Sequence, residues 1–358
     1  MPSLDNIAEI QRLDNDNILR NIQEFPDQCE RCFKDFQKFA LPSNYIQAKN
    51  IVLAGIGGSG IGGALVKNLA ITSKIPIFTW ADYDIPGFIS RDSLVIVTSY
   101  SGNTEETVSF LKKAGQRTRK IVTISSGGEI ESLSRTFRNP HYKIGYGSEP
   151  RAALGFLMTS ILAILIKLDI LEISSDDFQE AIVMLKGLQK KIDVDIPQGN
   201  NQAKILAQKL LGKIPIIYGA GIMAEVARRW KGQFNENAKT ASYWEIIPEL
   251  NHNSLAGLEY PKNLREKIFV IILESKFDHS RNRLRANLTA QILEKKRLDY
   301  DFVLLEPAPS PLSAIIETIL LGDYVSYYLA ILNNVEPNPI PVIKFLKDKL
   351  AEKPFETK

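Results

Sequence analysis

A glycine-rich turn is the first feature of the sequence that could carry chemistry. Gly55-Ile-Gly57-Gly-Ser-Gly60 satisfies the Gly-x-Gly-x-x-Gly pattern of dinucleotide-binding loops, and Asp82 or Asp84 follows at a distance that suits a ribose-binding acid. Such a turn also presents backbone N–H groups at the start of a helix, and these groups attract any anion. The turn alone therefore leaves dinucleotide binding and simple phosphate binding open.

A second cluster, Ser99-Tyr-Ser101-Gly-Asn-Thr104, places three hydroxyl groups directly after a short apolar run. One Ser or Thr side chain is enough to cap the helix that follows, whereas several hydroxyls together with backbone amides can hold phosphate oxygens. This arrangement binds phosphate without a group of fixed cations. Combined with Gly57, Gly58 and Ser59, the hydroxyls of Ser99, Ser101 and Thr104 predict a small sugar phosphate in preference to a dinucleotide.

The elements that must position these residues are short apolar strands that alternate with helices. In the first half, strands are predicted at residues 50–54, 75–80, 93–98 and 120–125, with a helix after the glycine turn and another after Thr104. Alternation at this spacing is typical of a parallel sheet covered by helices on both faces. The carboxyl ends of such strands meet at one edge, which would bring the glycine turn and the hydroxyls together.

The pattern then recurs in the second half of the chain. Pro215-Ile-Ile-Tyr-Gly-Ala-Gly-Ile matches the first strand and turn at an offset of 164 residues, for example from Gly55 to Gly219. Further strands are predicted at 241–245, 268–273 and from 301, with helices at 223–235 and 280–294. A repeat of this length indicates domain duplication. We therefore predict an α/β fold with a helical segment (1–45) and two doubly wound domains (46–172 and 173–358).

Composition and charge exclude several classes of protein. The 358 residues include 44 Lys and Arg against 41 Asp and Glu, so the net charge of +3 gives no basic surface for nucleic acid. The longest apolar run, Ala152 to Ile166, is shorter than the roughly 20 residues that span a bilayer, and no signal sequence is expected at the N-terminus. Cys29 and Cys32 lack the further ligands that a zinc site needs. We expect a cytoplasmic protein with no metal and two incidental thiols.

Five motifs in order resemble the bifunctional phosphoglucose/phosphomannose isomerases, a family built from two sugar isomerase (SIS) domains. They extend from about residue 45 to the C-terminus. The motifs are the glycine turn, the hydroxyl cluster, Glu149-Pro-Arg151-Ala-Ala-Leu-Gly, Phe234-Asn-Glu236-Asn-Ala-Lys and Glu249-Leu-Asn-His252-Asn. The resemblance implies a homodimer that interconverts glucose 6-phosphate or mannose 6-phosphate with fructose 6-phosphate, without metal or nucleotide.

The resemblance also implies a role for individual residues. Glu236 corresponds to the carboxylate base that moves a proton between C1 and C2, and Arg151 to the cation that stabilises the enediolate. His252 corresponds to the group that opens the sugar ring, and in this family it is offered to the partner subunit's site. A lysine of the last helix assists ring opening. It aligns with Lys347, although Lys344 lies one turn away.

Three other functions compete with this interpretation. A dinucleotide-dependent oxidoreductase would leave the three hydroxyls and the repeat without a role. A glutamine-dependent aminotransferase would require a glutaminase domain with an N-terminal cysteine, and the helical N-terminal segment does not fit one. A sugar-phosphate-binding regulator would require a DNA-reading domain, for which the N-terminal segment is short and acidic. The presence of Glu236, Arg151 and His252 together favours catalysis over binding alone.

Overall fold

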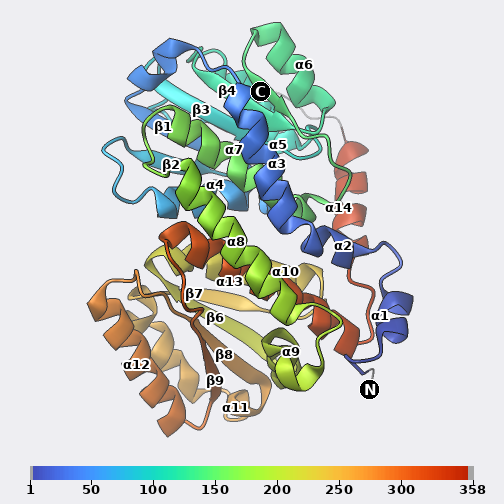
Figure 1. Ribbon diagram of the computed structural model, residues 1–358. Coiled ribbons are helices and arrows are strands. Elements are labelled where there is room, and N and C mark those ends of the chain that lie inside the picture. The colour runs from blue at the N-terminus through green and yellow to red at the C-terminus, as the bar shows by residue number, and fades with distance from the viewer. Residues whose placement is uncertain (1–2, 354–358) are drawn as a thin grey trace.

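Two parallel sheets, one in each half of the chain, form the framework of the protein (Figure 1). The computed structural model describes residues 3–353. The first sheet has five strands in the order β2-β1-β3-β4-β5, and all neighbouring strands are parallel. Its strands are β1 (Asn50–Ala54), β2 (Ile77–Trp80), β3 (Ser93–Thr98), β4 (Ile121–Ser125) and β5 (His141–Lys143).

The second sheet repeats the topology of the first. Its four strands are also parallel and have the order β7-β6-β8-β9, so that β6 takes the place of β1. These strands are β6 (Ile214–Ala220), β7 (Tyr243–Ile247), β8 (Ile268–Leu273) and β9 (Asp299–Val303). The shared order agrees with duplication, and the two helix-flanked parallel sheets confirm the predicted α/β fold.

Helices cover the faces of both sheets. Those of the first half are α4 (Gly57–Leu69), α5 (Glu105–Ala114), α6 (Gly128–Phe137) and α7 (Leu154–Lys167). Those of the second half are α9 (Gln202–Leu210), α10 (Ala224–Glu236), α11 (Leu264–Lys267), α12 (Ser280–Lys295) and α13 (Pro311–Leu332). The N-terminal segment forms α1 (Ile7–Leu13), α2 (Ile18–Gln23) and α3 (Phe25–Lys38). The helix α8 (Ser175–Ile192) runs across the front of both halves (Figure 1).

The largest apolar core is shared by the two halves. It contains Leu53 of β1 and Ile217 of β6, and it joins α3, α7, α8 and α13 in one continuous cluster. Among the described helices only α13 is long and apolar enough to cross a membrane, but it is completely buried inside the protein. It is therefore a core helix, and so is α7, which the apolar run at 152–166 predicted as a buried helix.

The two cysteines lie on the buried face of α3 and are not bonded to each other. Burial raises the pKa of the Cys29 thiol to about 12 and raises that of Cys32 as well. The Cys32 thiol donates to the carbonyl of Phe156 at 3.5 Å. Because the thiolate is the reactive form, both groups pack as small apolar side chains.

Candidate active site

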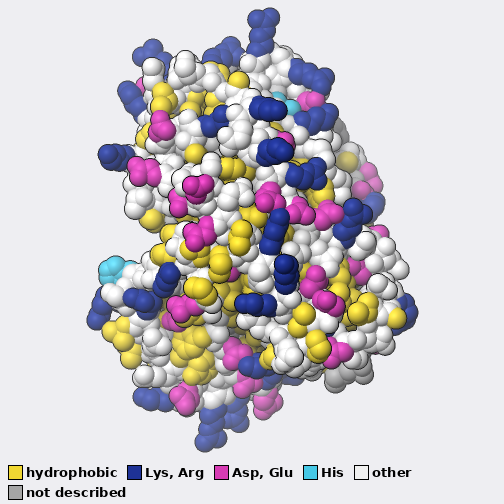
Figure 2. All heavy atoms as spheres, in the orientation of Figure 1, with side chains coloured by type: hydrophobic (Ala, Val, Ile, Leu, Met, Phe, Trp, Pro, Cys, Tyr) yellow, Lys and Arg dark blue, Asp and Glu magenta, His cyan; other side chains and the backbone are white. Residues whose placement is uncertain are grey.

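A cleft of about 310 Å³ lies between the glycine turn of the first half and α10 of the second half. Gly57 and Gly58 line one side of it, Thr79 and Trp80 follow at the end of β2, and Glu236 lines the other side. The outline of the molecule is notched between the two halves (Figure 2). This volume is at the lower end of the range for small-molecule sites. The cleft thus combines a candidate anion site with a candidate base.

The glycine turn brings the start of α4 close to Arg151 within the first half. Gly57 has φ +58°, a left-handed conformation that glycine adopts without strain. At Gly58, an added Cβ atom would lie 2.9 Å from the Arg151 nitrogen and 3.0 Å from the Pro150 carbonyl carbon. Only glycine permits this approach of α4 to the short 3₁₀ helix η2 (Pro150–Ala152). The turn therefore has two uses: it exposes backbone N–H groups and it positions Arg151.

The predicted phosphate-binding hydroxyls gather at the same sheet edge, since β1 and β3 are neighbours. The hydroxyl of Ser59 accepts a hydrogen bond from the Tyr100 amide at 2.9 Å, and Ser99 donates to the Thr104 hydroxyl at 3.0 Å. Ser59 and Ser99 are buried, whereas Ser101 is exposed. The hydroxyls form a polar cluster that is joined to the glycine turn through Ser59.

Glu236 and Arg151 come from different halves and meet beside the cleft. Glu236 is the last residue of α10, and its side chain is 31% exposed. Arg151 is 3% exposed, and its Nη1 lies 3.9 Å from Oε2 of Glu236. A half-buried carboxylate next to a buried guanidinium is an arrangement that can both accept a proton and stabilise a nearby oxyanion.

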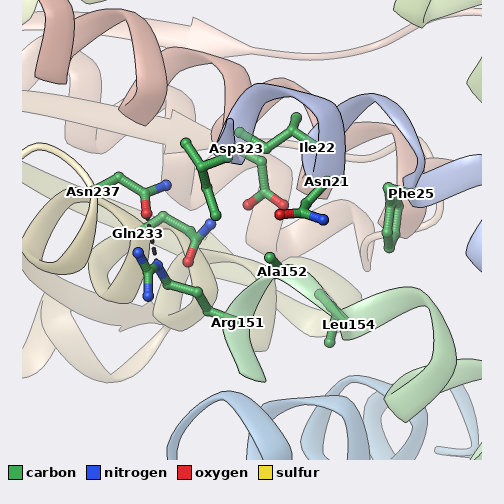
Figure 3. A pocket seen from close by; sticks show the side chains of 10 residues that line it. Asn21, Ile22, Phe25, Arg151, Ala152, Leu154, Gln233, Asn237 and Asp323 are labelled. Atoms are coloured by element: carbon green, nitrogen blue, oxygen red, sulfur yellow. Dashed lines mark hydrogen bonds between the residues drawn. The ribbon is translucent and has the colours of Figure 1, made fainter. Parts of the chain in front are cut away.

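The guanidinium of Arg151 is fixed by the second half. Nε donates to Oδ1 of Asn237 at 2.9 Å, and Nη2 donates to the carbonyl of Asn338 at 2.7 Å and of Pro337 at 3.3 Å. A cavity of about 10 Å³, room for about one water molecule, lies beside these groups and is lined by polar and apolar side chains (Figure 3). Burial lowers the pKa of Arg151, and the charge of Glu236 opposes this change.

A buried ion pair between α10 and α13 holds the backbone of Arg151 in place. Nη2 of Arg229 on α10 lies 3.0 and 2.9 Å from the carboxylate oxygens of Asp323 on α13, and it also donates to the carbonyl of Arg151 at 2.8 Å. The amide of Asn237 donates to the Ser326 hydroxyl at 3.0 Å. The sequence analysis did not identify these residues. The available signal was an acid, Asp323, within a largely apolar stretch.

The structure places His252 and Lys347 away from the cleft of their own chain. His252 ends the short 3₁₀ helix η5 (Glu249–His252), and Lys347 lies on α14 (Pro341–Ala351); both are exposed. Within residues 3–353 neither side chain forms an ion pair, whereas Lys344 pairs with Asp348 at 2.7 Å. One chain thus brings together residues predicted to bind phosphate, to act as the base and to stabilise the oxyanion, but not the two predicted ring-opening residues.

Comparison with known proteins identifies the family. The chain is 34% identical over 337 residues to the bifunctional phosphoglucose/phosphomannose isomerase of Caldicellulosiruptor bescii, a match that covers 94% of this chain and 99% of that protein. The chain belongs to the bifunctional phosphoglucose/phosphomannose isomerase family. The family member from Thermoplasma acidophilum is 36% identical over 303 residues, covering 84% of this chain and 90% of that protein. Residues 199–350 match the bacterial phosphoglucose isomerase C-terminal SIS domain.

Solved structures with the same fold have low sequence identity to this isomerase-family chain. The C-terminal domain of glucosamine-fructose-6-phosphate aminotransferase from Francisella tularensis superposes with a TM-score of 0.70 at 16% identity, covering 90% of this chain and 97% of that one. Glucose-6-phosphate isomerase from Chlamydia trachomatis has a TM-score of 0.69 at 13% identity, covering 91% of this chain and 72% of that one. These likenesses show a shared fold.

Two cations of α10 extend the site beyond the predicted residues of this family member. Arg228 and Lys231 line the cleft on the side opposite Gly57 and Gly58. Arg228 pairs with Glu225 one turn earlier, while Lys231 forms no ion pair within the described part of the chain. The sequence analysis expected phosphate binding by hydroxyls and amides without fixed cations. Spacing on one face of a helix was the signal for these two, but only the packing of the halves shows which way that face points.

Proposed function

We propose that the protein is an aldose–ketose isomerase that interconverts glucose 6-phosphate, mannose 6-phosphate or both with fructose 6-phosphate. The observation that carries this proposal is a cleft lined by the Gly57–Gly58 turn of the first half and by Glu236 of the second, with Arg151 beside it at 3.9 Å from Glu236. The related isomerases of known name support the same reaction class. The first SIS domain (46–172) would hold the phosphate, and the second (173–358) would supply the base.

The proposed mechanism begins with the phosphate bound by the Gly57 and Gly58 amides and by the adjoining hydroxyls of Ser59, Ser99, Ser101 and Thr104. Glu236 takes the proton from C2 of the open-chain aldose, which gives an enediolate, and returns it to C1. The proton of the C2 hydroxyl moves to O1, so that the ketose is formed without gain or loss of atoms. Nη1 of Arg151, which faces Glu236, stabilises the negative charge on the oxygens.

Ring opening is proposed to need a second copy of the chain. His252 would donate to or accept from the ring oxygen of the partner subunit's substrate, and Lys347 would assist. The exposed position of His252 supports this arrangement. The apolar residues of α14 support an interface, because Val342, Phe345 and Leu346 are 75%, 65% and 58% exposed. We propose a cytoplasmic homodimer.

The first test is a coupled assay of fructose 6-phosphate formation from each aldose phosphate. In Glu236→Gln the amide cannot accept the proton, so we expect kcat to fall about 10²- to 10⁴-fold with a small change in KM. Glu294→Gln alters an exposed glutamate of α12 and serves as the control. Wild-type turnover in Glu236→Gln would remove the proposed base. Tight sugar-phosphate binding without any turnover by the wild-type protein would favour a regulator.

A further inference from the structure

Lys239 occupies an unusual position directly after the helix that carries Glu236. Its backbone has φ +53°, a left-handed conformation in which Gly or Asn is commonly found and a lysine is strained. The residue as a whole is exposed, but its ammonium group turns inward. Nζ donates to the main-chain carbonyl of Glu236 at 2.6 Å and to that of Pro337 at 2.9 Å. The proposed proton transfer gives this lysine no role.

The turn that carries Lys239 is held firmly in place. The side-chain amide of Asn333 donates to the carbonyl of Ala238 and to the Thr240 hydroxyl, both at 3.0 Å. The amide of Asn235 donates to the Thr240 carbonyl at 2.8 Å. These bonds fix the backbone on both sides of Lys239, so the direction of its side chain is determined by the fold.

The two carbonyls that Lys239 binds belong to the helix that carries Glu236 and to the segment that holds Arg151. The Glu236 carbonyl is at the C-terminal end of α10, where a cation is also favoured by the helix dipole. The Pro337 carbonyl belongs to the segment that fixes Arg151, since Nη2 of Arg151 donates to Pro337 and Asn338. Lys239 and Arg151 therefore both donate hydrogen bonds to the same segment, which connects α13 to α14.

We propose that Lys239 is a positioning residue that clamps the end of α10 to the 337–338 segment and so sets the distance between Glu236 and Arg151. This inference rests on the proposed isomerase function. It predicts that loss of the clamp misplaces the base relative to the guanidinium while substrate binding by the first half continues.

The charge of the clamp responds to pH near neutrality. Burial of the ammonium group and the positive charge of Arg151 lower the pKa of Lys239 to about 8, while Glu236 and Glu336 oppose the change. The neutral amine is a weaker donor to the two carbonyls. The clamp should therefore loosen as the pH rises through 8.

The first test compares Lys239→Asn with wild type in the coupled assay. Asn accepts the left-handed backbone, so thermal stability should change little, while kcat should fall about 10-fold or more with KM within about twofold. Lys213→Met is the control, because Lys213 also donates to a main-chain carbonyl, that of Glu266 at 3.2 Å, but precedes β6 at the amino ends of the strands, away from the cleft. Wild-type kcat in Lys239→Asn would overturn the inference.

The second test uses Lys239→Arg, whose guanidinium stays charged at high pH. We expect this variant to retain activity and to lack the decline of kcat above pH 8. Hydrogen exchange supplies a readout without activity: the amides of Asn237 and Thr240, which donate to carbonyls at the end of α10, should exchange faster in Lys239→Asn than in wild type. Unchanged exchange would refute the clamp even if the protein is not an isomerase. Absence of turnover in wild type, by contrast, would refute the proposed function alone.

Discussion

A small number of polar contacts at the boundary between the halves fixes the position of Arg151 relative to Glu236. Nε and Nη2 of Arg151 are taken by Asn237 and by the 337–338 segment, which leaves Nη1 facing the carboxylate at 3.9 Å. A guanidinium remains charged at neutral pH even when burial lowers its pKa. Its orientation, once fixed, is available to a developing oxyanion without reorganisation.

Asp278 lies at the place in the second half that corresponds to the predicted phosphate-binding hydroxyls of the first half. The loop 274–279 follows β8 and ends at the N-cap of α12, as the loop 99–104 follows β3 and ends at the N-cap of α5. Gly221 corresponds to Gly57, and an added Cβ there would lie 2.8 Å from Oδ1 of Asp278. The second half thus holds a carboxylate where the first half is predicted to hold phosphate.

Burial of this carboxylate makes stability depend on pH. Asp278 is 7% exposed, its Oδ1 has no hydrogen-bond partner in the described chain, and burial raises its pKa from 3.8 to about 7. A raised carboxyl pKa means that stability is lost as the pH rises from about 4 to 7. Asp278→Asn should therefore raise the free energy of unfolding at pH 8 by about 1–3 kcal/mol and have little effect below pH 4.

Denaturant unfolding at pH 4, 6 and 8 checks this expectation. The exposed Asp195 provides a control, because Asp195→Asn removes a carboxylate that water already solvates. A constant difference between Asp278→Asn and wild type at all three pH values would contradict the assignment, since a packing effect has no reason to follow the titration of the carboxyl group.

At the scale of elements, apolar runs predicted the strands well and the central helix poorly. Runs such as 93–98 and 268–273 became buried strands because their residues are uniformly apolar and bounded by turns. The helix α13 was missed because Glu317, Gly322 and Asp323 interrupt its apolar sequence. Inside the protein these carboxylates have partners, such as Arg229 for Asp323. An ion pair between residues 94 positions apart depends on the tertiary fold, so a local sequence pattern does not predict it.

The sequence predicted the site residues that stand in local motifs, but not those whose role depends on how the helices pack. The glycine turn, the hydroxyls and Glu236 stand in motifs whose residue types suggest chemistry, and the fold places the glycines and Glu236 at one cleft. Arg228 and Lys231 on α10 line that cleft as well, but their spacing on one helix face does not by itself distinguish them from solvated cations. Their role depends on how α10 packs opposite α4, which the sequence of either helix does not specify.

The contact between α4 and η2 can be tested by a single methyl group. In Gly58→Ala the added carbon would lie 2.9–3.1 Å from backbone atoms of Pro150 and Arg151, which cannot yield as a flexible side chain would. We expect the free energy of unfolding to fall by about 1–3 kcal/mol and kcat to fall because Arg151 is displaced. Thermal unfolding and the coupled assay measure the two effects.

The same substitution elsewhere in a helix gives the control. Gly187 lies on α8, and an added Cβ there would meet no atom within 4 Å. Gly187→Ala should raise stability by about 0.5–1 kcal/mol through helix propensity and leave kcat unchanged. Equal behaviour of the two variants would mean that the close approach at Gly58 has no energetic consequence.

At the scale of the whole molecule, the two halves share one apolar core, and the cleft depends on their fixed relation. Glu236 lines the cleft of its own chain, whereas His252 is exposed and separate from it. On α14, which lies at the edge of the molecule (Figure 1), no residue is buried. A homodimer in which His252 completes the neighbouring site would account for both features.

Subunit mixing tests that arrangement directly. Glu236→Gln and His252→Ala should each be nearly inactive as pure dimers. When equal amounts of the two variants exchange subunits, about half of the dimers contain one subunit of each variant. Each such heterodimer has one site with both wild-type groups, so about one quarter of wild-type activity should return. A mixture of His252→Ala with itself gives the baseline. If His252 acted within its own chain, every site would lack one group and no activity would return, which would restrict the proposed reaction to single subunits.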